Sequence, residues 1–305
     1  MMNEIIEFCA EDGVVLNGYI NKGKVKTDKV LIELHGMTSN CFKRREKVIA
    51  KYVENIDIDS LCFNNRGSDI VKYIKYKDDK KKLAGTAYED IEESYYDVIG
   101  AIKCVIQLGY KKIFLQGHSL GATKLVYTFN KMKKNNSVYL KYINGIILLS
   151  LVDIPYIFNK FTNHKYHEYA MRKEKENSTL ELMPQDCFIH PISVKKFLKY
   201  TKYNKEIDFA KFSEDNYRFE ELNSINVPIF MRWGNNKELI EKDAKEQVEF
   251  MNKKIDNIFK DINYIDCANH TFSDKEEILA NQICEFLQKI YKINIFWLLI
   301  CGLMV

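Results

Sequence analysis

The residues best suited to chemistry centre on Ser119, within Gly117-His118-Ser119-Leu120-Gly121. This pattern follows a buried apolar run and precedes a helix-like run, the setting of a nucleophilic serine on a sharp strand-to-helix turn. Glycines two positions before and after the serine let the strand and the helix approach closely. The turn would expose the hydroxyl and direct the backbone N–H of Leu120 toward a bound anion. The alternative is a serine that only caps the helix.

A serine hydroxyl needs a general base, and the candidate is His270 in "CANHTFSD". This segment follows the last expected strand, so its loop can reach over the sheet edge toward Ser119. A second N–H for a developing oxyanion is expected at Met37 in "HGMTSN", where Gly36 allows a close backbone approach. His118 is expected to point away from the serine and to be structural.

The acid that would orient the histidine is harder to assign. It should follow the strand that ends in "MRWG" and precede His270. Glu238 is the first carboxylate on that loop and is our assignment. Asp153, after the preceding strand, and Asp243 are the alternatives. Each of these carboxylates could instead stabilise the start of a helix.

The elements that must position these residues alternate along the chain. We expect helices at 43–55, 88–109, from 120 onward and at 275–291, and strands within 4–10, 14–20, 29–36, 58–67, 111–116, 142–150, 227–234 and 261–266. Continuous apolar strands alternating with helices predict an α/β fold with a mostly parallel sheet covered on both faces. The lysine-rich run 75–82 is expected to be a solvated loop or helix surface.

Two segments depart from the alternation. Between residues 151 and 226 the chain is rich in aromatic and charged residues, and we expect a helical cap inserted into a core formed by 1–150 and 227–292. The tail, 293–305, is almost wholly apolar but shorter than the roughly 20 residues of a membrane-spanning helix. It is either a buried last element, a weak membrane contact or a dispensable end.

Composition restricts the class of protein. The chain has 305 residues, of which 46% are hydrophobic and 29% charged, as in a soluble globular protein. The net charge of +4 is small for this length and gives no support for a nucleic-acid partner. None of the eight cysteines forms a C-x-x-C pair, and acidic residues stand where the apolar part of a signal peptide would be. We therefore expect reduced thiols and a cytoplasmic location.

With "HGMTSN", "FNNRG", "GHSLG", "MRWGNNKELI" and "ANHTF" in this order, the chain resembles the α/β-hydrolase superfamily from about residue 4 to 291. The resemblance implies an eight-stranded, mostly parallel sheet with a cap insertion, and a serine, acid, histidine order along the chain. More narrowly, the chain is similar to a branch that includes fungal siderophore-ester hydrolases and uncharacterised bacterial members. It departs from the family, which commonly has Asp at the position of Lys237 or Glu238.

The resemblance implies hydrolysis of a small-molecule carboxylic ester, with Ser119 as nucleophile, His270 as base and Glu238 as its partner. The N–H groups of Met37 and Leu120 would bind the oxyanion, and no metal or organic cofactor is required. A thioesterase or acyltransferase would use the same residues. A non-catalytic binding protein and, from the apolar tail alone, a membrane-surface lipase are further alternatives.

Overall fold

The structure is a computed structural model that describes the backbone of residues 2–201 and 207–302 and the side chains of 4–201 and 207–291. An eight-stranded sheet forms its centre. Its strand order is β1-β2-β4-β3-β7-β8-β9-β10. Among the described strands of this sheet, β2 alone runs opposite to the others, so the β1–β2 and β2–β4 pairs are antiparallel and the remaining pairs parallel. The bounds are β1 Met2–Cys9, β2 Val15–Lys22, β3 Lys29–Leu34, β4 Asp59–Asn64, β7 Lys112–His118, β8 Ile143–Leu149, β9 Ile229–Gly234 and β10 Lys260–Ile265. The expected mostly parallel sheet is confirmed.

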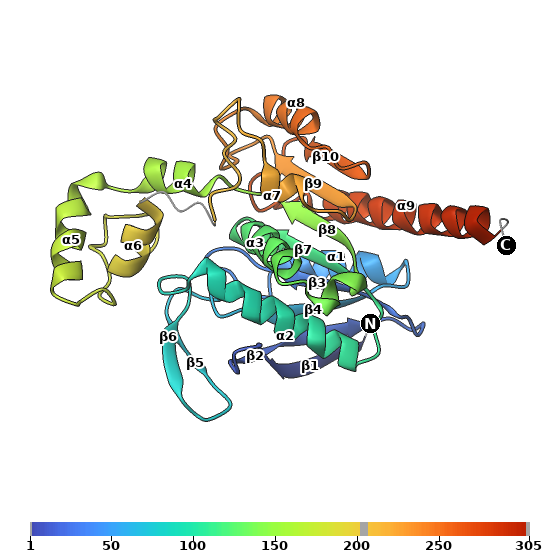
Figure 1. Ribbon diagram of the computed structural model, residues 1–305, viewed down its shortest axis with the longest axis horizontal. Helices are drawn as coiled ribbons and strands as arrows, with labels where there is room; N and C mark the ends of the chain where they lie inside the picture. Colours follow the sequence, from blue (N-terminus) through green and yellow to red (C-terminus); the bar gives the residue numbers. More distant parts are fainter. Residues whose placement is uncertain (1, 202–206, 303–305) are drawn as a thin grey trace.

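Helices cover both faces of this sheet (Figure 1). One face packs against α2 (Ser94–Gln107), α3 (Leu120–Lys134) and α8 (Ala244–Lys254), and the other against α1 (Arg44–Glu54) and α9 (Glu276–Gly302). Successive strand residues point to opposite faces, so both sides of a central strand must be apolar. Along β8, Ile146 and Leu148 belong to the first apolar cluster, while Ile147 and Leu149 belong to the second.

The lysine-rich run 75–82 forms the turn of a hairpin and the strand residues next to it, and nearly all of it is exposed, so the expected solvated loop surface is confirmed. Strands β5 (Lys72–Lys75) and β6 (Lys81–Ala84) pair antiparallel, and an isolated bridge between Val14 and Tyr76 fastens the hairpin to the rest of the fold. Asp79 adopts a positive φ of +63° in the turn, a conformation that Asp tolerates better than most residues. The pairing of the two strands beside this turn is the part that the charge pattern did not predict.

The helices after β8 form an apolar cluster of their own. They are α4 (Ile154–Phe161), α5 (His167–Lys175) and α6 (Val194–Thr201), and they lie to one side of the sheet (Figure 1). At the centre of this unit Phe158 stacks on both Phe188 and Tyr200, each with ring centroids 4.6 Å apart. Stacked aromatic rings give so small a unit much of its buried area.

The later part of the segment 151–226 packs elsewhere. Phe209, Phe212 and Phe219 belong to the main core cluster, as does the short helix α7 (Glu220–Asn223) through Leu222. Phe212 contacts Trp233 edge to face, with ring centroids 5.9 Å apart. The separate helical unit therefore ends with α6, because the apolar residues from Phe209 onward pack in the main core beside the sheet.

The apolar tail continues the last helix. Helix α9 runs to Gly302, while residues 303–305 and the side chains after Tyr291 lie outside the described part of the structure. The three alternatives for 293–305 therefore stay predictions. Within the described residues, no helix combines the length and apolar character that crossing a membrane requires.

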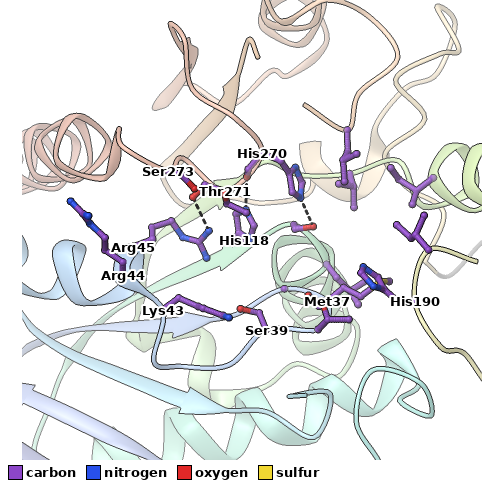
Figure 2. A pocket seen from close by; sticks show the side chains of 18 of the residues that line it. Met37, Ser39, Lys43, Arg44, Arg45, His118, His190, His270, Thr271 and Ser273 are labelled. Carbon is purple, nitrogen blue, oxygen red and sulfur yellow. Dashed lines mark hydrogen bonds between the residues drawn. The ribbon is translucent and has the colours of Figure 1, made fainter. Parts of the chain in front are cut away.

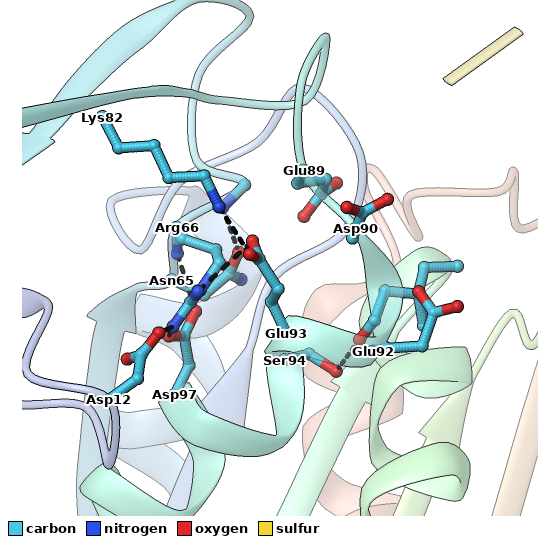
Figure 3. A network of polar contacts seen from close by, with 12 residues as sticks. Asp12, Asn65, Arg66, Lys82, Glu89, Asp90, Glu92, Glu93, Ser94 and Asp97 are labelled. Atoms are coloured by element: carbon cyan, nitrogen blue, oxygen red, sulfur yellow. Dashed lines mark hydrogen bonds and ion pairs between the residues drawn. The ribbon is translucent and has the colours of Figure 1, made fainter. Parts of the chain in front are cut away.

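A buried arginine holds the loop after β4 (Figure 3). The Arg66 side chain is 2% exposed and donates from Nε and Nη2 to Asp97 Oδ1 of α2, at 2.9 and 2.8 Å. It also reaches Asp12 in the β1–β2 turn at 2.9 Å and Glu93 at 3.3 Å. Because a charge this buried is costly unless paired, the three acids fix the loop, α2 and the N-terminal hairpin relative to one another.

Replacing this arginine should be costly to stability. We expect Arg66→Ala to lower the free energy of unfolding by about 3–5 kcal/mol, because it leaves the carboxylate of Asp97 buried without its cation. Lys82→Ala, which removes an exposed cation paired with Glu93 in the same network, should cost less than about 1 kcal/mol. Urea unfolding of the two variants measures the difference, and equal losses would contradict this account.

Candidate active site

Ser119 lies on a strained turn between β7 and α3. Its backbone has a φ of +54° and a ψ of −124°, a region that non-glycine residues rarely occupy. The N–H of Ser119 donates to the carbonyl of Leu149 at the end of β8, at 2.8 Å. The surrounding sheet and helix therefore impose a conformation that the residue would not adopt alone, as the turn pattern predicts.

Glycines make this turn possible, because a Cβ atom at their positions would collide with backbone atoms of neighbouring segments. A Cβ on Gly117 would come within 2.4 Å of the Gly121 carbonyl oxygen, and one on Gly121 within 2.3 Å of the Leu34 carbonyl oxygen. A Cβ on Gly36 would meet the carbonyl oxygen of His118 at 2.9 Å. The loop after β3 is thus packed directly against the serine turn.

The structure brings Ser119, His270 and Glu238 into one hydrogen-bonded row. Ser119 Oγ lies 2.9 Å from His270 Nε2, and His270 Nδ1 bonds to Glu238 Oε1. Because a carboxylate can only accept, Nδ1 carries the proton and Nε2 is left free to accept from the serine. The histidine side chain is 16% exposed and that of the glutamate 4%, so the acid is shielded while the base faces the cavity.

The Glu238 carboxylate is held by donors from several elements. Oε2 accepts from the N–H of Gly234 at 3.0 Å and from Ser150 Oγ at 2.8 Å, while Oε1 accepts from the N–H of Leu239 at 2.8 Å. Burial alone would raise the pKa of Glu238, but its bonds with His270 and the two backbone N–H groups lower it below its usual range. The carboxylate is therefore charged near neutral pH.

Ser150 is a residue that sequence reasoning missed. It directly follows β8, has a φ of +45°, and its Oγ also lies 3.1 Å from the carbonyl oxygen of His270. Its position directly after a buried parallel strand could have indicated a place in the site, because the carboxyl ends of such strands meet at one edge of the sheet.

The loops that carry the acid and the base are tied to each other. Asn235 Oδ1 accepts from the N–H of Cys267 at 2.6 Å, and the N–H of Asn236 donates to the carbonyl of Ala268 at 2.8 Å. A Cβ on Gly234 would lie 2.2 Å from that same carbonyl oxygen. These contacts fix the start of the acid loop, and the longer Glu side chain reaches His270 from there.

The two alternative acids have other partners. Asp153 accepts from the N–H of Tyr156 at 3.0 Å and caps α4, and burial raises its pKa to about 6. Asp243 accepts from the N–H groups of Lys245 and Glu246, at 2.8 and 3.0 Å, and caps α8. Both are N-cap carboxylates, which satisfy the free N–H groups of a helix start.

His118 supports the base from behind. Its Nε2 donates to the carbonyl oxygen of His270 at 2.7 Å, and its ring lies 5.0 Å from the ring of His270. Burial, with Arg45 nearby, lowers the pKa of His118 well below its usual value, so the ring is neutral. The residue therefore anchors the histidine loop, in line with the structural role expected from the sequence.

A cavity of about 500 Å³ opens beside Ser119 and His270 (Figure 2). Both predicted oxyanion residues, Met37 and Leu120, line it. Leu120 is the first residue of α3, so its N–H has no acceptor within the helix. The site can hold a nucleophilic oxygen, its base and a place for a developing anion.

All of these groups come from one edge of the sheet. Gly36 follows β3, Ser119 follows β7, Ser150 follows β8, and the loops with Glu238 and His270 follow β9 and β10. Because parallel strands end at the same edge, residues far apart in the sequence meet there.

Similarity to solved structures identifies the fold. The chain is similar to an esterase, Est1E, from Butyrivibrio proteoclasticus, solved with ferulic acid bound, with a TM-score of 0.65 and 16% identity over 93% of this chain and 99% of that one. It is also similar to the α/β hydrolase GrgF from Penicillium sp. sh18, with a TM-score of 0.66 and 15% identity over 95% and 99%. The Pyrococcus furiosus esterase PF2001 gives a TM-score of 0.58 and 18% identity over 94% and 91%.

No family model matches the sequence, and no curated protein matches it. The structural likeness, at these low identities, establishes that the chain has the α/β-hydrolase fold. The narrower similarity to siderophore-ester hydrolases stays a prediction.

The close packing around the serine turn can be tested by adding one methyl group. We expect Gly121→Ala to lower the free energy of unfolding by about 1–3 kcal/mol or more, because its Cβ would push α3 away from the backbone of β3. Gly145→Ala in β8 is the matched control, since its Cβ would meet side-chain carbons of Phe114 and Ile290 at 3.2 and 3.3 Å, which can shift. If urea unfolding shows Gly145→Ala to be the more damaging change, backbone crowding at Gly121 is not the constraint.

Proposed function

We propose that the protein hydrolyses a carboxylic ester of a small molecule through an acyl-enzyme on Ser119. The observation that carries this proposal is the row of hydrogen bonds from Ser119 Oγ through His270 to the buried Glu238. It occurs on a strained strand-to-helix turn that places Ser119 in the lining of the cavity at the edge of the sheet. A serine that merely capped a helix would need neither a base nor a buried carboxylate behind it.

In the first half of the reaction, Ser119 Oγ attacks the ester carbonyl as His270 Nε2 takes its proton. The charge on the former carbonyl oxygen is received by the N–H groups of Met37 and Leu120. Nε2–H then protonates the departing alcohol, which leaves an acyl group on Ser119. The serine O–C bond forms and the bond from the carbonyl carbon to the alcohol breaks, so no oxidant or metal is needed.

In the second half, water takes the place of the alcohol. His270 Nε2 removes a proton from the water as its oxygen attacks the acyl carbon, and then returns that proton to Ser119 as the acid leaves. Throughout, Glu238 holds the proton on Nδ1 and stabilises the transient imidazolium. Its depressed pKa supports this role, because a neutral acid there could not offset the positive ring.

The helical unit formed by α4–α6 is proposed to select the substrate. Ile154 and Ile157 of α4 and Ile189 of the loop before α6 line the cavity beside Ser119. Apolar side chains so placed favour an apolar group on one side of the ester. In this proposal the segment acts as a cap, as the sequence predicts.

Removing the nucleophile should abolish turnover without unfolding the protein. We expect Ser119→Ala to lower kcat for a short 4-nitrophenyl ester by at least about a thousandfold, leaving only what the oxyanion site and binding contribute. Labelling by a serine-directed phosphonate should be lost as well. Turnover near that of the wild type by a folded variant would rule out Ser119 as nucleophile.

The acid can be tested against its two alternatives. We expect Glu238→Gln to lower kcat at least about a hundredfold with little change in KM, because the carboxylate acts mainly on the imidazolium of the transition state. Asp153→Asn and Asp243→Asn should each cost less than about tenfold, since both cap helices. Rates must be compared at one pH on folded variants, and a larger loss in Asp153→Asn than in Glu238→Gln would place the acid after β8.

A further inference from the structure

The cavity beside Ser119 has an apolar half. Most of its lining on this side belongs to the apolar cluster of the α4–α6 unit, and the cluster includes Leu120, Val152, Ile154 and Ile157 with Met37 and Leu239 packed against it. This half suits a hydrocarbon part of a ligand.

The other half of the lining is polar and cationic. It comes from the segment that leads from β3 into α1, from the loop after β10 and from the start of α9, namely Ser39, Lys43, Arg44, Arg45, Thr271, Ser273 and Glu276. Figure 2 shows Lys43, Arg44 and Arg45 on the opposite side of His270 from Met37 and His190. The ester carbonyl would therefore sit between an apolar region and a region with three cations and one carboxylate.

Two of these cations are available to a ligand. Arg45 is buried and pairs with Glu46, so that pair is close to neutral. Arg44 is 70% exposed and its Nε lies 3.6 Å from Oε1 of the buried Glu276, while no carboxylate among the described residues pairs with its two terminal nitrogens. Lys43 is exposed, and no ion pair joins it to a carboxylate among the residues that the structure describes.

Arg45 gives an independent indication that this half is built for polar groups. Its side chain is 6% exposed and lines the cavity, yet its Nε–H has no acceptor in the described structure. Its Nη1 reaches only the Thr271 carbonyl, at 3.4 Å. A buried guanidinium with unused donor capacity is costly unless another acceptor completes its bonding.

We infer that the preferred substrate is an ester that also carries a carboxylate, bound on the side of Lys43 and Arg44, with its apolar part against Ile154 and Ile157. This inference rests on the proposed esterase function and specifies its substrate class. A carboxylate fits because the free charges are on flexible, partly solvated side chains that attract an anion over several ångströms. A neutral ester of the same length would forgo that attraction.

The test compares charged and neutral esters in two matched pairs. Mono-4-nitrophenyl adipate against 4-nitrophenyl hexanoate places the charge on the acyl side. The hexanoate ester of 4-hydroxybenzoate against that of its methyl ester places the charge on the alcohol side. The rate of each substrate with the Ser119→Ala variant is subtracted, and kcat/KM is measured at low salt.

We expect the charged member of one pair to be preferred by about tenfold in the wild type. The double variant Lys43→Gln/Arg44→Gln should lower this preference at least about fivefold, and raising NaCl to about 0.5 M should reduce it in the wild type by screening. Lys47→Gln, which removes an exposed cation of α1 that does not line the cavity, should leave the preference unchanged.

The outcomes separate this inference from the proposed function. If the wild type hydrolyses the neutral esters through Ser119 but prefers neither charged ester, the substrate class is wrong and the esterase function stands. A preference that persists unchanged in the double variant and at high salt also overturns the inference. If none of the four esters is hydrolysed, the esterase proposal fails, and the inference fails with it.

Discussion

The structure depends on the close approach of α3 to the central strands at the serine turn. Gly117 and Gly121 leave no room for a side chain, and this contact forces Ser119 into a backbone conformation that it would otherwise avoid. The strain is sustained because β3, β7 and β8 are buried on both faces and cannot shift without opening the core. The position of the Ser119 hydroxyl beside the cavity at the sheet edge is a consequence of that packing.

A buried glutamate in place of the more common aspartate needs a particular environment. The N–H groups of Gly234 and Leu239 and the hydroxyl of Ser150 satisfy the carboxylate oxygens that His270 does not. His270 and the two backbone N–H groups together hold the pKa of Glu238 below its usual range despite its burial, so the carboxylate stays charged and can stabilise an imidazolium. The departure from the family pattern at this position is therefore compatible with the chemistry that the rest of the site favours.

The alternation of apolar strands and helices was sufficient to predict the sheet, because each buried strand must be apolar on both faces and each covering helix on one. The β5–β6 hairpin was not predicted, since half of its strand residues are exposed and its lysine-rich strands lack the apolar pattern of a core strand. The extent of the α4–α6 unit was not predictable either. The sequence does not distinguish aromatic residues of the unit from those that follow it, yet Phe197 packs within the unit and Phe212 packs in the main core.

The sequence by itself determined the local features of the site, namely the strand-to-helix turn around Ser119 and the candidates on the loops near His270 and Glu238. A turn is encoded by neighbouring residues, so its pattern can be read directly. Only the tertiary structure decided which carboxylate faces His270, that Ser150 and His118 support the pair, and that Lys43 and Arg44 line the same cavity. Those relations join residues that are distant in the chain, and they are set by how strand ends and loops meet at one edge of the sheet.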